Sequence, residues 1–168
     1  TIAVLRLFAV GDDCPARFAA RDRRYRYQIA RVKDPFRLGQ AYYYTVPLNV
    51  AAMNEAAALL LQYTDFECFS KVHTDVFTFN CNIAEAYWET ADQRLIFHIR
   101  ANRFLRGMVR AIVGTLLDVG KGKRSIQDFE RLILEKNRKK AGPQAPAHGL
   151  FLTEVGYPEA VLGRSTNG

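Results

Sequence analysis

One stretch of the chain, residues 102–120, constrains the fold more than any other. Its apolar residues recur at spacings of three and four, which predicts a helix over 103–120 with one broad apolar face. The residues of this face are Phe104, Leu105, Met108, Ile112, Leu116 and Val119. Such a face must be buried against other elements, so the chain needs an internal core beside this helix.

The opposite side of the predicted helix carries Arg103, Arg106 and Arg110, alternating with Gly107 and Gly114. Like charges at these spacings repel by about 0.2–0.5 kcal/mol per pair, and each glycine weakens a helix by about 1 kcal/mol relative to alanine. Glycine also exposes backbone and permits close approach by another body. The pattern favours an anionic partner or a buried carboxylate that compensates for these effects. The alternative is an ordinary solvated face.

The charge of the chain points to the kind of partner. Its 168 residues include 24 lysines and arginines against 17 acidic residues, a net charge of +7, which favours an anionic partner such as nucleic acid. A membrane surface is the competing partner, but the longest uninterrupted apolar run, residues 56–61, is too short to span a bilayer. No signal peptide pattern opens the chain, so we expect a cytoplasmic protein. The length suits a single domain over 1–168, with a loose tail from 158.

Residues that could bind metal are scattered along the chain. The cysteines are Cys14, Cys68 and Cys81, and the histidines are His73, His98 and His148. The cysteines lack C-x-x-C spacing, so we expect core thiols and no metal site. Asp75, close to His73, could suggest a catalytic carboxylate, but we interpret it as a solvated loop residue.

The remaining pattern predicts the other elements. Strands are expected at 2–10, 23–30, 76–81, 83–89, 95–100 and 149–155, and further helices at 49–62 and 125–136. Asn49 can cap the first of these helices, and Ser125 with Asp128 resembles a capping box at the second. This order predicts an α+β domain with a largely antiparallel sheet and helices packed on one face.

The strand predicted at 23–30 lies in the most basic part of the chain, because residues 17–37 contain seven arginines and one lysine. Its period of two places Tyr25, Tyr27 and Ile29 on one face. Arginines beside aromatic rings suit nucleic acid, since arginine binds phosphate and an aromatic ring stacks on an exposed base. A half-buried strand with core tyrosines and solvated arginines explains the same pattern, and both interpretations stay open here.

Three segments together resemble the bacterial tRNA pseudouridine synthase A family. They are ARFAARDRRYRY at 16–27, ANRFLRGMVRAIVG at 101–114 and GLFLTEVGY at 149–157. The three occur in the order of that family and extend over nearly the whole chain. The resemblance implies the pseudouridine synthase fold and an enzyme that isomerises uridines of the tRNA anticodon stem-loop to pseudouridine. It also implies a homodimer that uses no metal or organic cofactor.

The resemblance also implies roles for individual residues. Tyr25 would border or stack on a uracil flipped out of the RNA, and Arg110 would pair with the catalytic aspartate. Leu150 and Leu152 would lie near the wall of the uracil pocket. Charge and position, more than motif, suggest RNA backbone contacts for further arginines. These are Arg17, Arg21, Arg23, Arg24, Arg103 and Arg106.

One part of the family pattern is absent from the 168 residues. In the family the catalytic aspartate lies in a stretch like Arg-Thr-Asp-Ala-Gly, upstream of the segment that corresponds to the first strand predicted here, residues 2–10. The sequence His73-Thr74-Asp75-Val76 echoes that stretch but lies downstream of Tyr25. The chain therefore resembles the C-terminal portion of the synthase, and we expect no isomerase activity from it alone. The alternative is a non-catalytic RNA-binding domain on the same scaffold.

Overall fold

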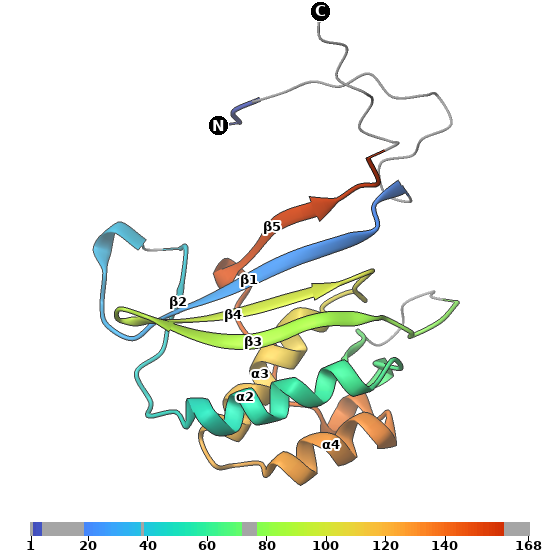
Figure 1. Ribbon diagram of the computed structural model, residues 1–168. Coiled ribbons are helices and arrows are strands. Elements are labelled where there is room, and N and C mark those ends of the chain that lie inside the picture. The colour runs from blue at the N-terminus through green and yellow to red at the C-terminus, as the bar shows by residue number, and fades with distance from the viewer. Residues whose placement is uncertain (1, 5–18, 38, 72–76, 160–168) are drawn as a thin grey trace, which may run out of the picture.

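The computed structural model describes residues 2–4, 19–37, 39–71 and 77–159, and a five-stranded sheet forms its centre (Figure 1). The strands are β1 (Asp22–Ala30), β2 (Tyr42–Tyr43), β3 (Ile83–Ala91), β4 (Arg94–Ala101) and β5 (Leu150–Gly156). β4 lies between β3 and β1, whereas β5 and the short β2 both pair with the other side of β1. Only the β1–β2 pair is parallel, so the expected, largely antiparallel sheet is confirmed.

The described α-helices cover one face of this sheet (Figure 1). They are α2 (Val50–Leu59), α3 (Met108–Gly120) and α4 (Ile126–Glu135). Short 3-10 turns occupy 35–37, 60–62, 67–69, 138–140 and 147–149. The predicted α+β class, with helices on one face, is therefore confirmed.

Local sequence signals account for where two helices begin. The side chain of Asn49 accepts a hydrogen bond from the amide of Ala52 at 3.0 Å, which caps α2 as expected. At α4, the Ser125 hydroxyl accepts from the amide of Asp128 at 3.0 Å, and the Asp128 side chain accepts from the Ser125 amide. This capping box is confirmed, with aspartate in place of the usual glutamate.

The core lies between the sheet and the helices. On β1, Tyr27 and Ile29 have no exposed surface. The strand face predicted to carry Tyr25, Tyr27 and Ile29 is therefore the face that the helices cover. α3 is buried almost all round: every one of its residues is buried except Arg110 and Asp118. Its expected apolar face therefore exists from Met108 onward, but the opposite side is not an ordinary solvated face.

The start of α3 corrects the predicted helix over 103–120. Gly107 has φ +74°, a left-handed conformation that interrupts a helical backbone, and α3 begins only at Met108. Arg103 and Arg106 consequently lie in the preceding loop and share no helix face with Arg110. The predicted stripe of three arginines was wrong, because glycine at this position supplied a helix boundary and not a weak point within a helix.

A second correction concerns the strand predicted at 76–81. Residues 77–81 join no ladder of the sheet, although Asn80 forms an isolated bridge with Asp65. Instead, the Phe66 amide donates to the Phe79 carbonyl at 3.1 Å and the Cys81 amide to the Thr64 carbonyl at 2.8 Å. The backbone of residues 77–81 thus forms hydrogen bonds with the loop around Thr64 and Phe66. Val76, most of the strand predicted at 2–10 and the end of the expected tail lie outside the described residues.

Candidate functional site

The predicted pocket residues meet at the edge of the sheet formed by β5. Leu152 lies opposite Tyr25, and Leu150 lies opposite Tyr27, in the antiparallel β1–β5 pair. Opposite residues in such a pair share one face, and Tyr27 is buried under the helices, so Tyr25 and both leucines belong to the helix-covered face. Leu150 packs against the core, whereas Leu152 is 51% exposed. In the described part of the chain β5 pairs with β1 alone, which leaves this edge open.

Tyr25 is half-buried and its ring is held by an aromatic contact. The ring packs edge-to-face against Phe104, with centroids 5.2 Å apart and an interplanar angle of 88°. Phe104 lies in the loop before α3, so this contact joins β1 to that loop. Edge-to-face pairs restrict ring orientation. Tyr25 is therefore a pre-positioned aromatic surface beside the open edge of the sheet.

Arg110 lies in the first turn of α3 and forms two hydrogen bonds with Ala145. Its Nε donates a hydrogen bond to the Ala145 carbonyl at 2.6 Å, and its own carbonyl accepts from the Ala145 amide at 3.0 Å. Among the residues that the structure describes, none accepts a hydrogen bond from the terminal nitrogens of Arg110. Two terminal NH2 groups on a fixed guanidinium are suited to bind a carboxylate with two parallel hydrogen bonds.

Tyr27 connects Arg110 to the strand that carries Tyr25. Its hydroxyl donates to the Pro146 carbonyl at 2.8 Å, one residue beyond Ala145. Burial and the neighbouring Tyr42 raise the pKa of Tyr27, whereas the positive charge of Arg110 opposes that rise. The Tyr27 hydroxyl thus stays protonated and close enough to Arg110 to experience its charge.

Two predicted RNA-binding arginines already bind other parts of the chain. One Arg23 terminal nitrogen donates to the Asn102 carbonyl at 2.7 Å and to the Ala20 carbonyl at 3.1 Å. Arg24 alternates with Tyr25 and faces the opposite side of the sheet. There it forms ion pairs with Glu85 at 2.9 Å and with Glu154 at 3.4 Å. The structure does not bring Arg24 to the face that carries Tyr25.

The other described arginines that were predicted to bind RNA lie just before β1 or in the loop before α3. Arg106 is exposed, and Arg103 is half-buried in the loop before α3, where its charge acts on Cys81. Arg21 is exposed just before β1, and its amide donates to the Gly156 carbonyl at 2.8 Å. Arg17 lies outside the described residues. RNA contact by these side chains stays a prediction.

Sequence reasoning missed residues 140–146, which lie along α3 and supply the carbonyl that holds Arg110. We call this segment the strap. The loop of small residues had no assigned role, although Gly114 had been interpreted as permitting close approach by another body. A Cβ on Gly114 would collide with the Pro143 carbonyl oxygen, so that other body is the strap itself. Gly114 was therefore the sequence feature that indicated this contact.

The described residues form few other groups of side chains with catalytic or metal-binding chemistry. No group of three or more histidine, cysteine or acidic side chains within the described ranges could hold a metal ion. His98 lies 2.7 Å from Glu89 and stacks on Tyr87, on the uncovered side of the sheet. Cys14, His73 and Asp75 fall outside those ranges. No helix in the described ranges is long and apolar enough to cross a bilayer.

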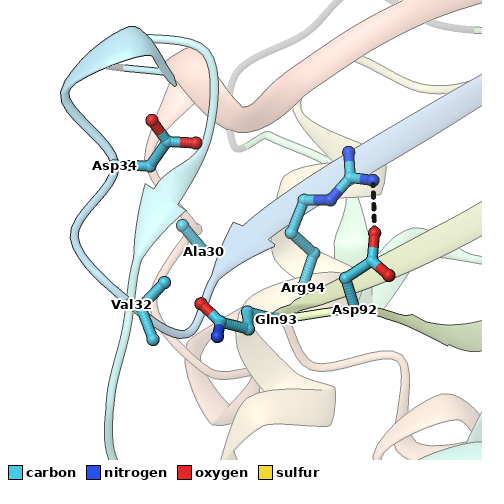
Figure 2. A pocket seen from close by; sticks show the side chains of 6 residues that line it. All are labelled: Ala30, Val32, Asp34, Asp92, Gln93 and Arg94. Carbon is cyan, nitrogen blue, oxygen red and sulfur yellow. Dashed lines mark ion pairs between the residues drawn. The ribbon is translucent and has the colours of Figure 1, made fainter.

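Two hollows lined by described residues lie away from the predicted uracil pocket. One, of about 200 Å³, lies at the end of β1, where Arg94 and Asp92 form an ion pair at 3.8 Å (Figure 2). Its lining residues are Ala30, Val32, Asp34, Asp92, Gln93 and Arg94. A second hollow of about 700 Å³ adjoins it and includes Tyr43 and His148. None of the predicted site residues that the structure describes lines either hollow.

Comparison with known proteins identifies the family. Residues 56–158, more than half of the chain, match the sequence profile described as tRNA pseudouridine synthase. The chain belongs to this family. Proteins named tRNA pseudouridine synthase A from Bacteroides fragilis and Porphyromonas gingivalis are 49% and 50% identical over 96% and 94% of the chain. The one from Bacillus licheniformis is 42% identical over 93% of it.

The chain spans less than two thirds of these relatives, namely 64%, 63% and 64% of their respective lengths. The matched part is their C-terminal portion. The family resemblance expected from the sequence motifs is therefore confirmed, together with the portion of the synthase that it covers.

Proposed function

We propose that this chain is the C-terminal part of a tRNA pseudouridine synthase and supplies half of its active site. One observation carries the proposal: the Arg110 guanidinium is held through Nε, and no residue that the structure describes binds its two terminal nitrogens. It lies in the first turn of α3, where the helix end adds partial positive charge. An arginine in this setting is suited to bind a carboxylate through its two terminal nitrogens.

The carboxylate that fits this arginine is the catalytic aspartate of the family, which lies outside the 168 residues. Arg110 would keep that aspartate ionised and oriented towards the sugar of the target uridine. In the reaction, the bond from C1′ to N1 breaks and a bond from C1′ to C5 forms, so the C5 hydrogen is released. Tyr25, with Leu150 and Leu152, would border the flipped uracil and keep the detached base in place.

The substrate that we propose is tRNA, modified at uridines of the anticodon stem-loop, and the enzyme would act as a homodimer in the cytoplasm. The net charge of +7 supports a polyanionic substrate. The names of the relatives support tRNA as the RNA. Arg21, Arg103 and Arg106, which lie before β1 and before α3, are the described arginines best placed to bind the phosphate backbone. Equilibrium sedimentation of the complete enzyme tests the dimer, which a monomer mass would contradict.

The decisive experiment measures release of tritium from 5-tritiated uridine in tRNA. It compares the isolated chain with the complete enzyme, meaning this chain preceded by the segment that carries the aspartate. We expect release from the complete enzyme only. Arg110→Ala in the complete enzyme should abolish release and leave tRNA binding nearly unchanged. Turnover by the isolated chain would contradict the proposed division of the site.

The second candidate is a non-catalytic RNA-binding domain on the same scaffold. The net positive charge favours it equally, since charge alone does not distinguish binding from catalysis. Arg110 discriminates between the two, because an inactive binder has no catalytic carboxylate that requires this side chain. Full tRNA affinity of a complete protein that releases no tritium would establish the binder and exclude the synthase.

A further inference from the structure

The strap, residues 140–146, is joined to α3 by hydrogen bonds at two levels. The Gly142 amide donates to the Thr115 hydroxyl at 3.0 Å, and the Thr115 hydroxyl donates in turn to the Ala111 carbonyl at 2.7 Å. Nearer the start of the helix, Ala145 exchanges two hydrogen bonds with Arg110, at 2.6 Å and 3.0 Å. The strap thus follows the helix from the residues around Thr115 back to Arg110.

Glycines allow this close approach. A Cβ added to Gly142 would lie 2.8 Å from an Asp118 carboxylate oxygen and 3.0 Å from the Gly114 carbonyl oxygen. One added to Gly114 would lie 2.9 Å from the Pro143 carbonyl carbon. These neighbours are mostly backbone atoms, which cannot rotate away as side chains do. Helix and strap therefore fit together in one register, and the Ala145 carbonyl has a defined position.

The far end of the strap is anchored to the sheet by Tyr27. This side chain has no exposed surface, and its hydroxyl donates to the Pro146 carbonyl at 2.8 Å. Its ring also packs against Gly149, where an added Cβ would lie 2.9 Å from a ring carbon. The peptide that follows Ala145 is consequently fixed from the side of β1, and α3 fixes it from the other side.

We propose that Tyr27 and Thr115 are positioning residues for Arg110, acting through the strap. The Tyr27 hydroxyl and the Thr115 hydroxyl hold the strap at its two ends, and the strap presents the Ala145 carbonyl that orients Nε of the guanidinium. With Nε fixed, the terminal nitrogens point in one direction and receive their carboxylate without reorientation. This inference rests on the proposed function, because it concerns the arginine that the active site would use.

Tyr27→Phe in the complete enzyme tests the inference, since phenylalanine keeps the buried ring and removes only the hydroxyl. We expect kcat for tritium release to fall by about tenfold, the lower range for loss of a supporting hydrogen bond around an active-site group. KM for tRNA should stay unchanged, because Tyr27 is buried and contacts no substrate. Tyr63→Phe is the matched control: it removes the same hydroxyl from a bond to Glu130 at 2.7 Å and should leave kcat unchanged.

Thr115 supplies an independent pair of variants. Thr115→Ser keeps the oxygen that accepts from the Gly142 amide and should retain wild-type kcat. Thr115→Val removes that oxygen and should lower kcat without changing KM. Because removal of the oxygen also leaves the buried Gly142 amide without an acceptor and costs stability, kcat is expressed per folded molecule, with the folded fraction of each variant taken from urea unfolding. Equal kcat for the serine and valine variants would overturn the role of Thr115.

A measurement on the isolated chain needs no activity. Hydrogen exchange of the Arg110 Nε–H, followed by NMR, should be slow in the wild type and clearly faster in Tyr27→Phe. Unchanged exchange together with unchanged kcat would overturn the positioning role. Absence of tritium release from the wild-type complete enzyme would instead contradict the proposed function, and slow Nε–H exchange that depends on Tyr27 would still support the strap.

Discussion

Replacing Gly114 by alanine sets two effects of similar size against each other. Alanine within a helix is more favourable than glycine by about 1 kcal/mol, so secondary structure alone predicts that Gly114→Ala stabilises α3. In the folded chain, however, the added Cβ would collide with the Pro143 carbonyl oxygen and lie 3.3 Å from the Ala145 amide nitrogen. Because α3 is buried between the sheet and its neighbours, the strap must move and the helix cannot.

Moving the strap breaks the hydrogen bonds that tie it to α3. Neutral bonds contribute about 0.5–1.5 kcal/mol each, and a bond from a charged group such as Arg110 contributes about 1.5–3 kcal/mol. Two neutral bonds and one charged bond join the strap to Thr115 and Arg110. The low end of each range applies, since Arg110 is partly exposed to water. Subtracting the helix gain leaves a net destabilisation of about 1.5 kcal/mol.

Urea unfolding of the chain measures this difference, followed by fluorescence of the single tryptophan, Trp88, which is 4% exposed. Gly120→Ala is the comparison in the same helix, because the nearest neighbours of its Cβ would be atoms of the flexible Met53 and Leu48 side chains and not backbone. We expect Gly120→Ala to lose less stability than Gly114→Ala. A Gly114→Ala chain as stable as the wild type would refute the argument that the strap lies against backbone.

Three further predictions concern charge and thiols. Arg100 donates a hydrogen bond to Asp22 and lowers the pKa of that carboxyl. The ion pair therefore stabilises the folded chain at any pH above the pKa that Asp22 has in the unfolded chain. This stabilisation is lost as the pH falls through the lower pKa of the folded chain. Asp22→Asn should therefore lower the urea midpoint at pH 7, and the difference should shrink as the pH falls below the ordinary pKa range of a carboxyl group. Burial raises the pKa of Cys68 to about 12 and that of Cys81 to about 11, and both side chains have no exposed surface. A Cys14→Ser chain should therefore react with a disulfide reagent only after unfolding, and fast reaction in the native state would contradict this burial. Arg106→Ala should reduce the salt slope of tRNA binding by about 1, whereas Arg24→Ala should reduce it less, because Glu85 and Glu154 already pair with Arg24. Equal slopes for the two variants would contradict this difference.

Local signals predicted the fold well where one residue type had one structural meaning. The period of two in β1, the Asn49 cap and the capping box at Ser125 were all confirmed, since each depends on neighbours within four residues. The strand predicted at 76–81 was wrong because its partner is the loop around Thr64 and Phe66. Sequence periodicity records a tendency to be extended, but it does not record which backbone will be available as a partner.

The candidate site was less accessible to prediction from residues alone. The resemblance suggested Tyr25, Arg110, Leu150 and Leu152, and the structure places the three predicted pocket residues on the helix-covered face near the β5 edge. The Ala145 carbonyl could not be predicted, because any residue offers the same backbone atom. Only the distant pairing of Arg110 with Ala145 gives that carbonyl its role. The period of two placed Tyr27 on one face of its strand. It did not predict the hydrogen bond to Pro146, which lies 119 positions away in the sequence.

The backbone angle at Gly107 determines whether the arginines before and within α3 lie close enough to repel one another. Placed on one helix, Arg103, Arg106 and Arg110 would repel one another and require a shared anion. The left-handed conformation of Gly107 removes the first two from the helix, so that shared requirement disappears. What remains is more specific. Arg110 is the one basic residue in a helix that is otherwise buried except at Asp118, and a backbone carbonyl already fixes one edge of its guanidinium. A general polyanion would be served as well by exposed arginines. A single held guanidinium with two available nitrogens instead favours one carboxylate at one place, which is the requirement of an active site.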